Sequence, residues 1–147
     1  MGESARILVV DYNESVRKIL QIVLEHAGYL IDTAKTGEEA LKTAKVRHPN
    51  LALVDCSLID IELKTFLKKI SKIAPSTQIL IVADKSSLHE VKEMVSKAGK
   101  KPYPYLLKPF QMEKALALIR EQLRKQRWRK RVESITIEFV KPLEKRV

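Results

Sequence analysis

The sequence contains a single cysteine, Cys56, among its 147 residues. One thiol cannot form an internal disulfide, and a lone buried thiol fits a reducing compartment. Long apolar stretches are also missing, because no uninterrupted apolar run exceeds the five residues 79–83, far fewer than a membrane-spanning helix needs. The opening residues MGESARI show no apolar stretch of the signal-peptide kind. We therefore predict a cytoplasmic protein that does not associate with a membrane.

Histidine is scarce as well. The three histidines, His26, His48 and His89, stand singly and match no metal-ligand spacing. We interpret them as ordinary helix or loop residues, and we expect no histidine-based metal centre.

Positive charge is abundant but unevenly distributed. The formal net charge is +10, of which residues 1–119 carry +4, residues 120–131 (REQLRKQRWRKR) carry +6, and residues 132–147 are balanced. The basic character therefore belongs to one short segment and not to the main domain.

Strand-like and helix-like stretches alternate along the first 128 residues or so. Five apolar runs are typical of buried strands: RILVV (6–10), YLIDTA (29–34), LALV (51–54), QILIVA (78–83) and YLL (105–107). A helix is predicted after each run: apolar residues spaced three and four apart indicate four of them, with Gly28 and Gly99 ending the first and the fourth. Acids in the first turn at Glu38 and Glu39 and a stop at Pro49 indicate the second helix. This alternation predicts an α/β fold, a doubly wound parallel sheet of five strands with five helices on both faces. Such sheets bind ligands outside the carboxyl ends of their strands.

Charged residues stand at the predicted strand ends. Asp11 follows the first strand, Asp55 the third and Lys108 the fifth. In the strand order 2-1-3-4-5 the first and third strands are neighbours, so the two aspartates would face each other and attract a cation. Oxygen ligands suit Mg²⁺, and a lysine can pair with a phosphate, which together favour phosphoryl transfer through an aspartyl phosphate. Any one of these acids alone is better explained as a helix cap or turn residue, but three convergent charges favour a functional site.

At these residues the chain resembles the receiver domain of two-component response regulators, the fold of the single-domain chemotaxis regulator. The resemblance covers about residues 5–126. It rests on ILVVD at the first strand, TGEEAL at the second helix, NLALVD at the third strand, ILIVA at the fourth and YLLKPF at the fifth.

The resemblance implies a role for each site residue. Asp55 would be the phospho-acceptor, and Lys108 would pair with the phosphoryl group. Asp11, Asp55 and the backbone carbonyl of Ser57 would hold Mg²⁺, and the bond between Lys108 and Pro109 would be cis. A histidine kinase or phosphotransfer protein would supply the phosphoryl group, and a downstream protein would receive the signal.

Two positions depart from the family pattern. Tyr12 stands where the family has a second acid, so we expect weak Mg²⁺ binding, with Asn13 or Glu14 as substitute oxygen donors out of register. Ala83 stands at the switch position where the family has Thr or Ser, and it has no hydroxyl. The aromatic switch residue is kept as Tyr105.

These departures leave alternatives open. The chain is a weakened phospho-receiver or a pseudo-receiver that works without phosphorylation, and the survival of Asp55 and Lys108 favours the first. A phosphatase of the haloacid-dehalogenase type needs an acid two residues after its nucleophile, but position 13 is Asn. We therefore expect a signalling module and not an enzyme with a separate substrate.

The C-terminal segment is expected to be distinct from the receiver domain of residues 1–126. Residues 127–147 would form a basic helical extension and a short strand at 134–140, where apolar residues alternate. The segment offers a contact for nucleic acid, without a recognised motif, or for an acidic partner. We also expect a possible homodimer through the fourth and fifth helices and this tail. The candidate contact residues are Arg124, Lys125, Arg127, Trp128, Arg129, Lys130 and Arg131.

Overall fold

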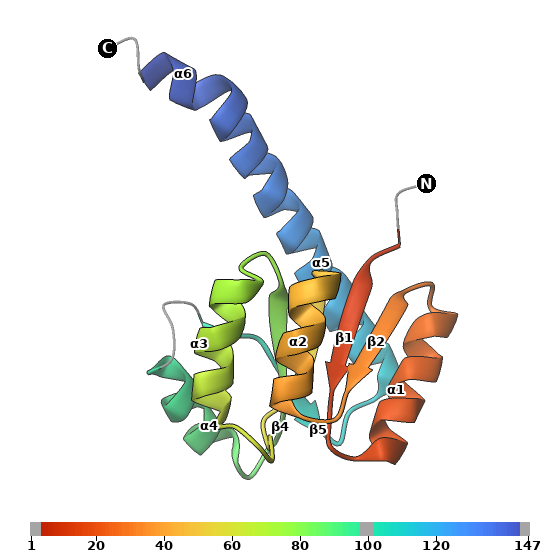
Figure 1. The fold of residues 1–147 in the computed structure, drawn as a ribbon. Coiled ribbons are helices and arrows are strands. Elements are labelled where there is room, and N and C mark those ends of the chain that lie inside the picture. The colour runs from red at the N-terminus through yellow and green to blue at the C-terminus, as the bar shows by residue number, and fades with distance from the viewer. Residues whose placement is uncertain (1–3, 98–101, 145–147) are drawn as a thin grey trace.

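The computed structural model describes residues 4–97 and 102–144. Five parallel strands form one sheet in the order β2-β1-β3-β4-β5, so the predicted doubly wound fold is confirmed (Figure 1). The strands are β1 (Arg6–Val10), β2 (Leu30–Ala34), β3 (Leu51–Asp55), β4 (Gln78–Asp84) and β5 (Tyr105–Lys108). The helices are α1 (Glu14–His26), α2 (Gly37–Arg47), α3 (Leu63–Ile73), α4 (Leu88–Ser96), α5 (Met112–Ile135), the π-helix Thr136–Val140 and α6 (Lys141–Glu144).

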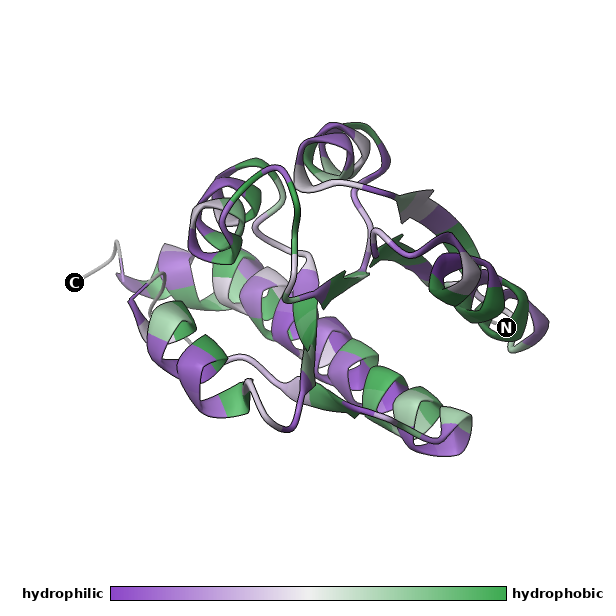
Figure 2. Cartoon of the chain, turned by 90° about the horizontal axis from the view of Figure 1, so that it is seen from below, coloured by the Kyte–Doolittle hydropathy of each residue, from purple (hydrophilic) through white to green (hydrophobic). Residues whose placement is uncertain are grey.

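Alternate residues of each strand enter two separate apolar cores, one on each face of the sheet. Leu8 and Val10 of β1 pack on one face, with residues of α2, α3 and α4. Ile7 and Val9 pack on the other face, with residues of α1 and α5. The helices accordingly lie on both sides of the strands when the molecule is seen from the end where the strands finish (Figure 2). Burial on both faces explains why the strand sequences are continuously apolar.

Local sequence signals mark the end of α1 and the start of α2. Gly28 follows α1 with φ of +99°, a conformation that glycine adopts without a steric penalty. Thr36 caps α2, because its side-chain oxygen accepts a hydrogen bond from the Glu39 amide. Gly99, the predicted end of the fourth helix, lies outside the described residues.

The fifth helix continues well past the sheet. It passes residue 126 without a break and projects beyond the body at the end from which the strands start (Figure 1). Its 24 residues are strongly charged, and among the described residues no helix has the length and apolar character that a bilayer crossing requires.

Three polar side chains of α5 attach the start of this extension to the body. Gln122 and Gln126 are buried, although they are polar. The Gln126 amide donates to the Ser76 carbonyl at 2.6 Å, the Gln78 amide donates to Gln122 Oε1 at 2.9 Å, and Arg129 donates to Gln78 Oε1 at 2.6 Å. We call Gln122, Gln126 and Arg129 the polar clamp. It holds the helix against the starting ends of the sheet up to about residue 129.

The strand predicted for residues 134–140 is wrong. This segment is helical, with α5 running to Ile135 and the π-helix covering Thr136–Val140. A strand needs a neighbouring strand for its backbone hydrogen bonds, whereas a helix satisfies them within itself. With no described sheet edge beside it, the segment extends the helix that precedes it.

Candidate functional site

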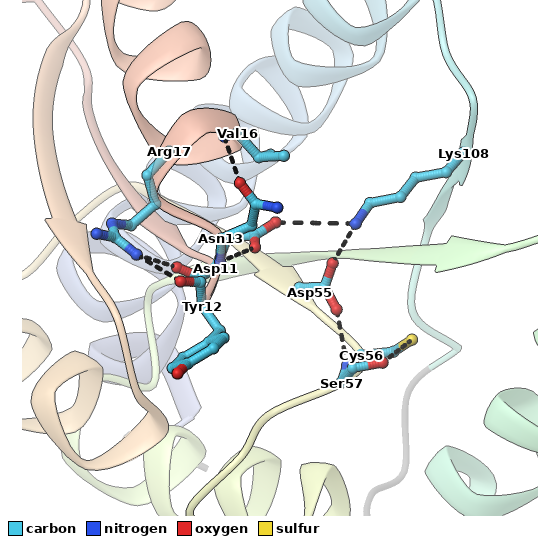
Figure 3. Close-up of polar contacts among 9 residues, drawn as sticks. All are labelled: Asp11, Tyr12, Asn13, Val16, Arg17, Asp55, Cys56, Ser57 and Lys108. Atoms are coloured by element: carbon cyan, nitrogen blue, oxygen red, sulfur yellow. Dashed lines mark hydrogen bonds and ion pairs between the residues drawn. The ribbon is translucent and has the colours of Figure 1, made fainter.

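Three charged side chains meet at the carboxyl end of the sheet. Asp11 directly follows β1, Asp55 ends β3 and Lys108 ends β5. The Lys108 Nζ lies 2.5 Å from Asp55 Oδ2 and 3.8 Å from Asp11 Oδ2, and the three side chains point toward one another (Figure 3). The convergence predicted from the strand ends is therefore confirmed, because β1 and β3 are neighbours in the sheet.

Each carboxylate is oriented by the backbone that follows it. The Asn13 amide donates to Asp11 Oδ1 and the Ser57 amide donates to Asp55 Oδ1, both at 2.8 Å. These are local turns in which an aspartate accepts from the amide two residues on. One oxygen of each acid is thereby occupied, and the other oxygen faces Lys108.

The charges of the site shift the pKa values of its groups. Burial raises the pKa of Asp11 and the neighbouring Asp55 charge raises it further, against the lowering effects of the Asn13 amide and Lys108. Burial alone would lower the pKa of Lys108, but its hydrogen bond to Asp55 and the charges of both acids raise it above its ordinary value. The two carboxylates therefore make a region of negative potential, in which Lys108 is held fully charged.

Tyr12 contributes no polar group to this cluster. Its side chain is 51% exposed and points away from Asp11 and Asp55 (Figure 3). The Lys35 Nζ lies 5.1 Å from the centre of its ring, a cation–π contact outside the crevice. The site consequently has the two carboxylates of Asp11 and Asp55, whereas an acid at position 12 would supply a third.

Neither of the expected substitute donors replaces that acid. Asn13 Oδ1 accepts from the Val16 amide at 3.1 Å and so caps α1. Glu14 is exposed and pairs with Lys18 at 3.6 Å, one turn along the helix. Both side chains serve the helix and not the crevice.

The donor set still suits a weakly held Mg²⁺. Among the residues that the structure describes, no group of three or more His, Cys, Asp or Glu side chains is arranged to hold a metal ion. Mg²⁺ in proteins is nevertheless bound through one or two carboxylates and keeps several waters. Asp11, Asp55 and the Ser57 carbonyl provide that minimum, while Lys108 already neutralises part of their charge. The residues present therefore fit the ion, with low expected affinity.

The remaining expected positions lie around the site. Ala83 is buried on β4, and its methyl group offers no hydrogen-bond donor. Tyr105 on β5 is partly buried, and the Lys92 Nζ lies 5.6 Å from the centre of its ring. The bond between Lys108 and Pro109 is cis, as the resemblance implies.

Sequence reasoning missed two supporting residues. Arg17 donates to the backbone carbonyls of Asp11 and Tyr12 at 2.7 and 3.0 Å, and it thereby fixes the turn after β1. Asp60 accepts from the amides of Gly37 and Glu38, both at 2.9 Å, and joins the loop after β3 to the start of α2. No local pattern signals either contact, because each depends on how separate elements pack.

The chain is similar to several known proteins. A family model described as the response regulator receiver domain matches residues 7–120. A probable transcriptional regulator, ycf27, of Cyanophora paradoxa is 32% identical over 120 residues, which cover 82% of this chain and 48% of that protein. The response regulator ArlR of Staphylococcus aureus is 31% identical over 121 residues, covering 82% and 53%. The chain thus spans about half the length of the curated relatives it matches.

A solved structure shares the fold over nearly its full length. It is a CheY-like response regulator receiver domain protein from Methanospirillum hungatei, 31% identical, with a TM-score of 0.77. The match covers 86% of this chain and 98% of that one. Both the sequence and the arrangement of elements therefore resemble receiver domains.

Proposed function

This chain belongs to the response regulator receiver domain family, and we propose that it accepts a phosphoryl group on Asp55 in the cytoplasm and signals through protein contacts. The observation that carries the proposal is the cluster of Asp11, Asp55 and Lys108 at adjacent strand ends. We assign Asp55 as the acceptor because its Oδ2, the oxygen that the Ser57 amide does not hold, contacts the Lys108 ammonium group directly. Asp11 lies further from that ammonium group.

The proposed donor is a phosphohistidine on a histidine kinase or on a phosphotransfer protein. A carboxylate oxygen of Asp55 attacks the phosphorus, a P–O bond forms, and the P–N bond to the imidazole breaks. The imidazole nitrogen keeps the electron pair of that bond, and the product is an aspartyl phosphate on this chain.

Two contacts prepare Asp55 for this step. The Ser57 amide holds Oδ1 and so directs Oδ2 toward the crevice. Lys108 is already placed at Oδ2, and after transfer its ammonium group can pair with a phosphoryl oxygen in the same region. Little rearrangement is needed, because the positive charge is in place before the reaction.

A bound Mg²⁺ would supply positive charge against the phosphoryl oxygens. Asp11, Asp55 and the Ser57 carbonyl would hold it, and the missing acid at Tyr12 makes the site weak. Asp11 contributes negative charge without being the acceptor.

We do not extend the proposal to catalysis on a separate substrate. A phosphatase of the haloacid-dehalogenase type would need an acid at position 13, and the Asn13 side chain there is occupied in capping α1.

Intact mass spectrometry tests the proposal. The full chain is incubated with a small phosphodonor and Mg²⁺, beside Asp55→Asn and the matched control Asp84→Asn, an exposed acid at the end of β4. We expect one phosphoryl increment in the wild type and in Asp84→Asn, and none in Asp55→Asn. An increment that persists in Asp55→Asn refutes the assignment, and its absence from the wild type refutes phospho-acceptance.

A further inference from the structure

Four arginines form a straight ridge along α5. They follow one another at intervals of four, three and four residues, which places them on one side of a continuous α-helix. At the rise of an α-helix the ridge is about 16 Å long. All four side chains are exposed. We call these residues the arginine ridge: Arg120, Arg124, Arg127 and Arg131.

The arginine ridge lies opposite the side by which α5 is attached to the body. The polar clamp of Gln122, Gln126 and Arg129 marks the side that faces the sheet. The ridge is rotated from the clamp by about half a turn of the helix. Another molecule can therefore approach the ridge without displacing the contacts that hold α5 in place.

No acidic side chain among the described residues neutralises the ridge. The ion pairs within residues 4–97 and 102–144 include none of its four arginines. Glu121, one turn before Arg124, is instead paired with Lys125 at 3.6 Å. Like charges three and four residues apart on a helix repel one another and destabilise it. The ridge therefore costs the free protein stability, and a bound polyanion would remove that cost.

A hollow beside the ridge offers a place for a phosphate group. It has a volume of about 390 Å³, and Arg120 and Arg127 line it together with Tyr29 and Asn50 of the body. A guanidinium group can donate two parallel hydrogen bonds to phosphate oxygens, which an ammonium group cannot do. Two arginines at one hollow are therefore suited to a phosphate that lies between them.

The surroundings of the ridge favour a duplex over other polyanions. A helix that lies on a bilayer surface needs large apolar side chains beside its basic ones. Within residues 120–131, all of which the structure describes, Trp128 is the one exposed large apolar side chain. Single strands are bound in grooves where several aromatic rings stack on bases, whereas this surface is a convex helix. The groove of a DNA duplex admits an α-helix and has phosphates along both of its edges.

We propose that the arginine ridge binds the phosphate backbone of duplex DNA without regard to base sequence. Each of the four arginines contacts one phosphate, and contacts of this kind position a protein on DNA without reading its bases. The ridge lies toward the starting ends of the strands, whereas Asp55 lies where the strands finish. The proposal can therefore fail or succeed separately from phosphorylation of Asp55.

The salt dependence of binding tests the number of phosphate contacts. Fluorescence anisotropy of a labelled duplex of about 20 base pairs measures the affinity of the full chain between about 50 and about 200 mM salt. Four contacts predict a slope of about −3.6 for the logarithm of the association constant against that of the salt concentration, or a loss of affinity on the order of a hundredfold over this range. Two duplexes of unrelated sequence should bind equally. Absence of binding, a slope shallower than about −1, or a strong preference for one sequence overturns the proposal.

Two variants of equal net charge test the place of binding. The ridge variant replaces all four ridge arginines with glutamine, which has a similar helix propensity. The matched control removes the same charge from exposed lysines of α2 and α3, as Lys42→Gln, Lys45→Gln, Lys68→Gln and Lys72→Gln.

We expect the ridge variant to lose at least about a hundredfold in affinity at low salt, and the control to keep the wild-type slope. The single variant Arg124→Gln should reduce the slope by about 0.9. Thermal melts verify folding, and the ridge variant should melt no lower than the wild type because its repulsion is gone. Equal losses in the ridge variant and the control would assign binding to net charge alone and overturn the ridge as the site.

Competition identifies the kind of polyanion. A single-stranded oligonucleotide of the same length and vesicles of phosphatidylserine and phosphatidylcholine are titrated against the labelled duplex at one salt concentration. We expect the unlabelled duplex to compete best. Tighter binding to the single strand or to the vesicles overturns the assignment to duplex DNA.

Discussion

At the scale of single residues, we propose that Tyr12 limits the binding of a cation at the site. Its ring lies outside the crevice under Lys35, and neither Asn13 nor Glu14 supplies an oxygen in its place. Asp11 and Asp55 are the acids whose carboxylates lie within ion-pair distance of the Lys108 ammonium group among the described residues.

Tyr12→Asp should strengthen Mg²⁺ binding. The new carboxylate follows Asp11 directly and adds a charged oxygen ligand to a site with two, so we expect the dissociation constant to fall at least about tenfold. Isothermal titration measures it, and Tyr12→Asn serves as a control that removes the ring without adding charge. Equal affinities of wild type and Tyr12→Asp would show that another feature limits binding.

Asp11→Asn should stabilise the fold at neutral pH. The pKa of Asp11 is raised by burial and by Asp55, so between its ordinary and its folded pKa the folded state binds more protons than the unfolded state. Stability therefore falls as pH rises through that window, and the ionised carboxylate costs stability above it. Asparagine keeps an oxygen for the Asn13 amide and removes the charge. For a chain of this size about 1 kcal/mol corresponds to roughly 3 °C in melting temperature.

Thermal melts of both proteins at pH 7 and at acid pH measure this effect. The advantage of Asp11→Asn should shrink as pH falls, because the wild-type carboxyl group then becomes neutral. A variant that is less stable at pH 7 would mean that attraction to Lys108 outweighs the cost of burial.

Some residues of the site could be predicted from the sequence and others could not. Asp11, Asp55 and Lys108 were predictable, because each follows an apolar strand and parallel strands bring their carboxyl ends to one edge. The roles of Arg17 and Asp60 were not, because their partners are backbone groups of other segments whose position only packing determines.

At the scale of elements, the fifth helix is the feature that most extends the molecule. The polar clamp buries Gln122 and Gln126 between this helix and the starting ends of the strands. Because these amides are satisfied, the helix is joined to the body in one register.

Gln126→Ala should destabilise the protein by about 0.5–1.5 kcal/mol, since it removes the hydrogen bond from the buried Gln126 amide to the Ser76 carbonyl. Arg127→Ala, at the adjacent exposed position, should change stability by less than about 0.5 kcal/mol. Urea denaturation of both variants measures the difference. Equal stability of the two would show that the clamp contributes nothing.

Helices and strands were predictable where the pattern of apolar residues indicates burial. The five strands were located within about one residue, because continuous apolar runs between helical patterns indicate a sheet covered on both faces. The strand expected at 134–140 does not form, because the alternation of Ile135, Ile137 and Phe139 requires a neighbouring strand and the described residues place none beside it. Because residues 134–140 are exposed and have no neighbouring strand, they continue the helix that precedes them.

At the scale of the whole molecule, the site and the extension lie at opposite ends of the sheet (Figure 1). The acids stand where the strands finish, and the extension leaves where they start. Ala83, which lies beside the site near the end of β4, has no hydroxyl with which to follow a phosphoryl group.

The central claim is that Asp55 carries the phosphoryl group as an acyl phosphate. Borohydride reduction tests it most directly, because it converts a phosphorylated aspartate into homoserine and leaves a free carboxylate unchanged. The full chain is treated with phosphodonor and Mg²⁺, reduced, digested and mapped by tandem mass spectrometry. We predict homoserine at position 55 and intact aspartate at positions 11 and 84. Intact aspartate at position 55, or homoserine at position 11 instead, would contradict the account.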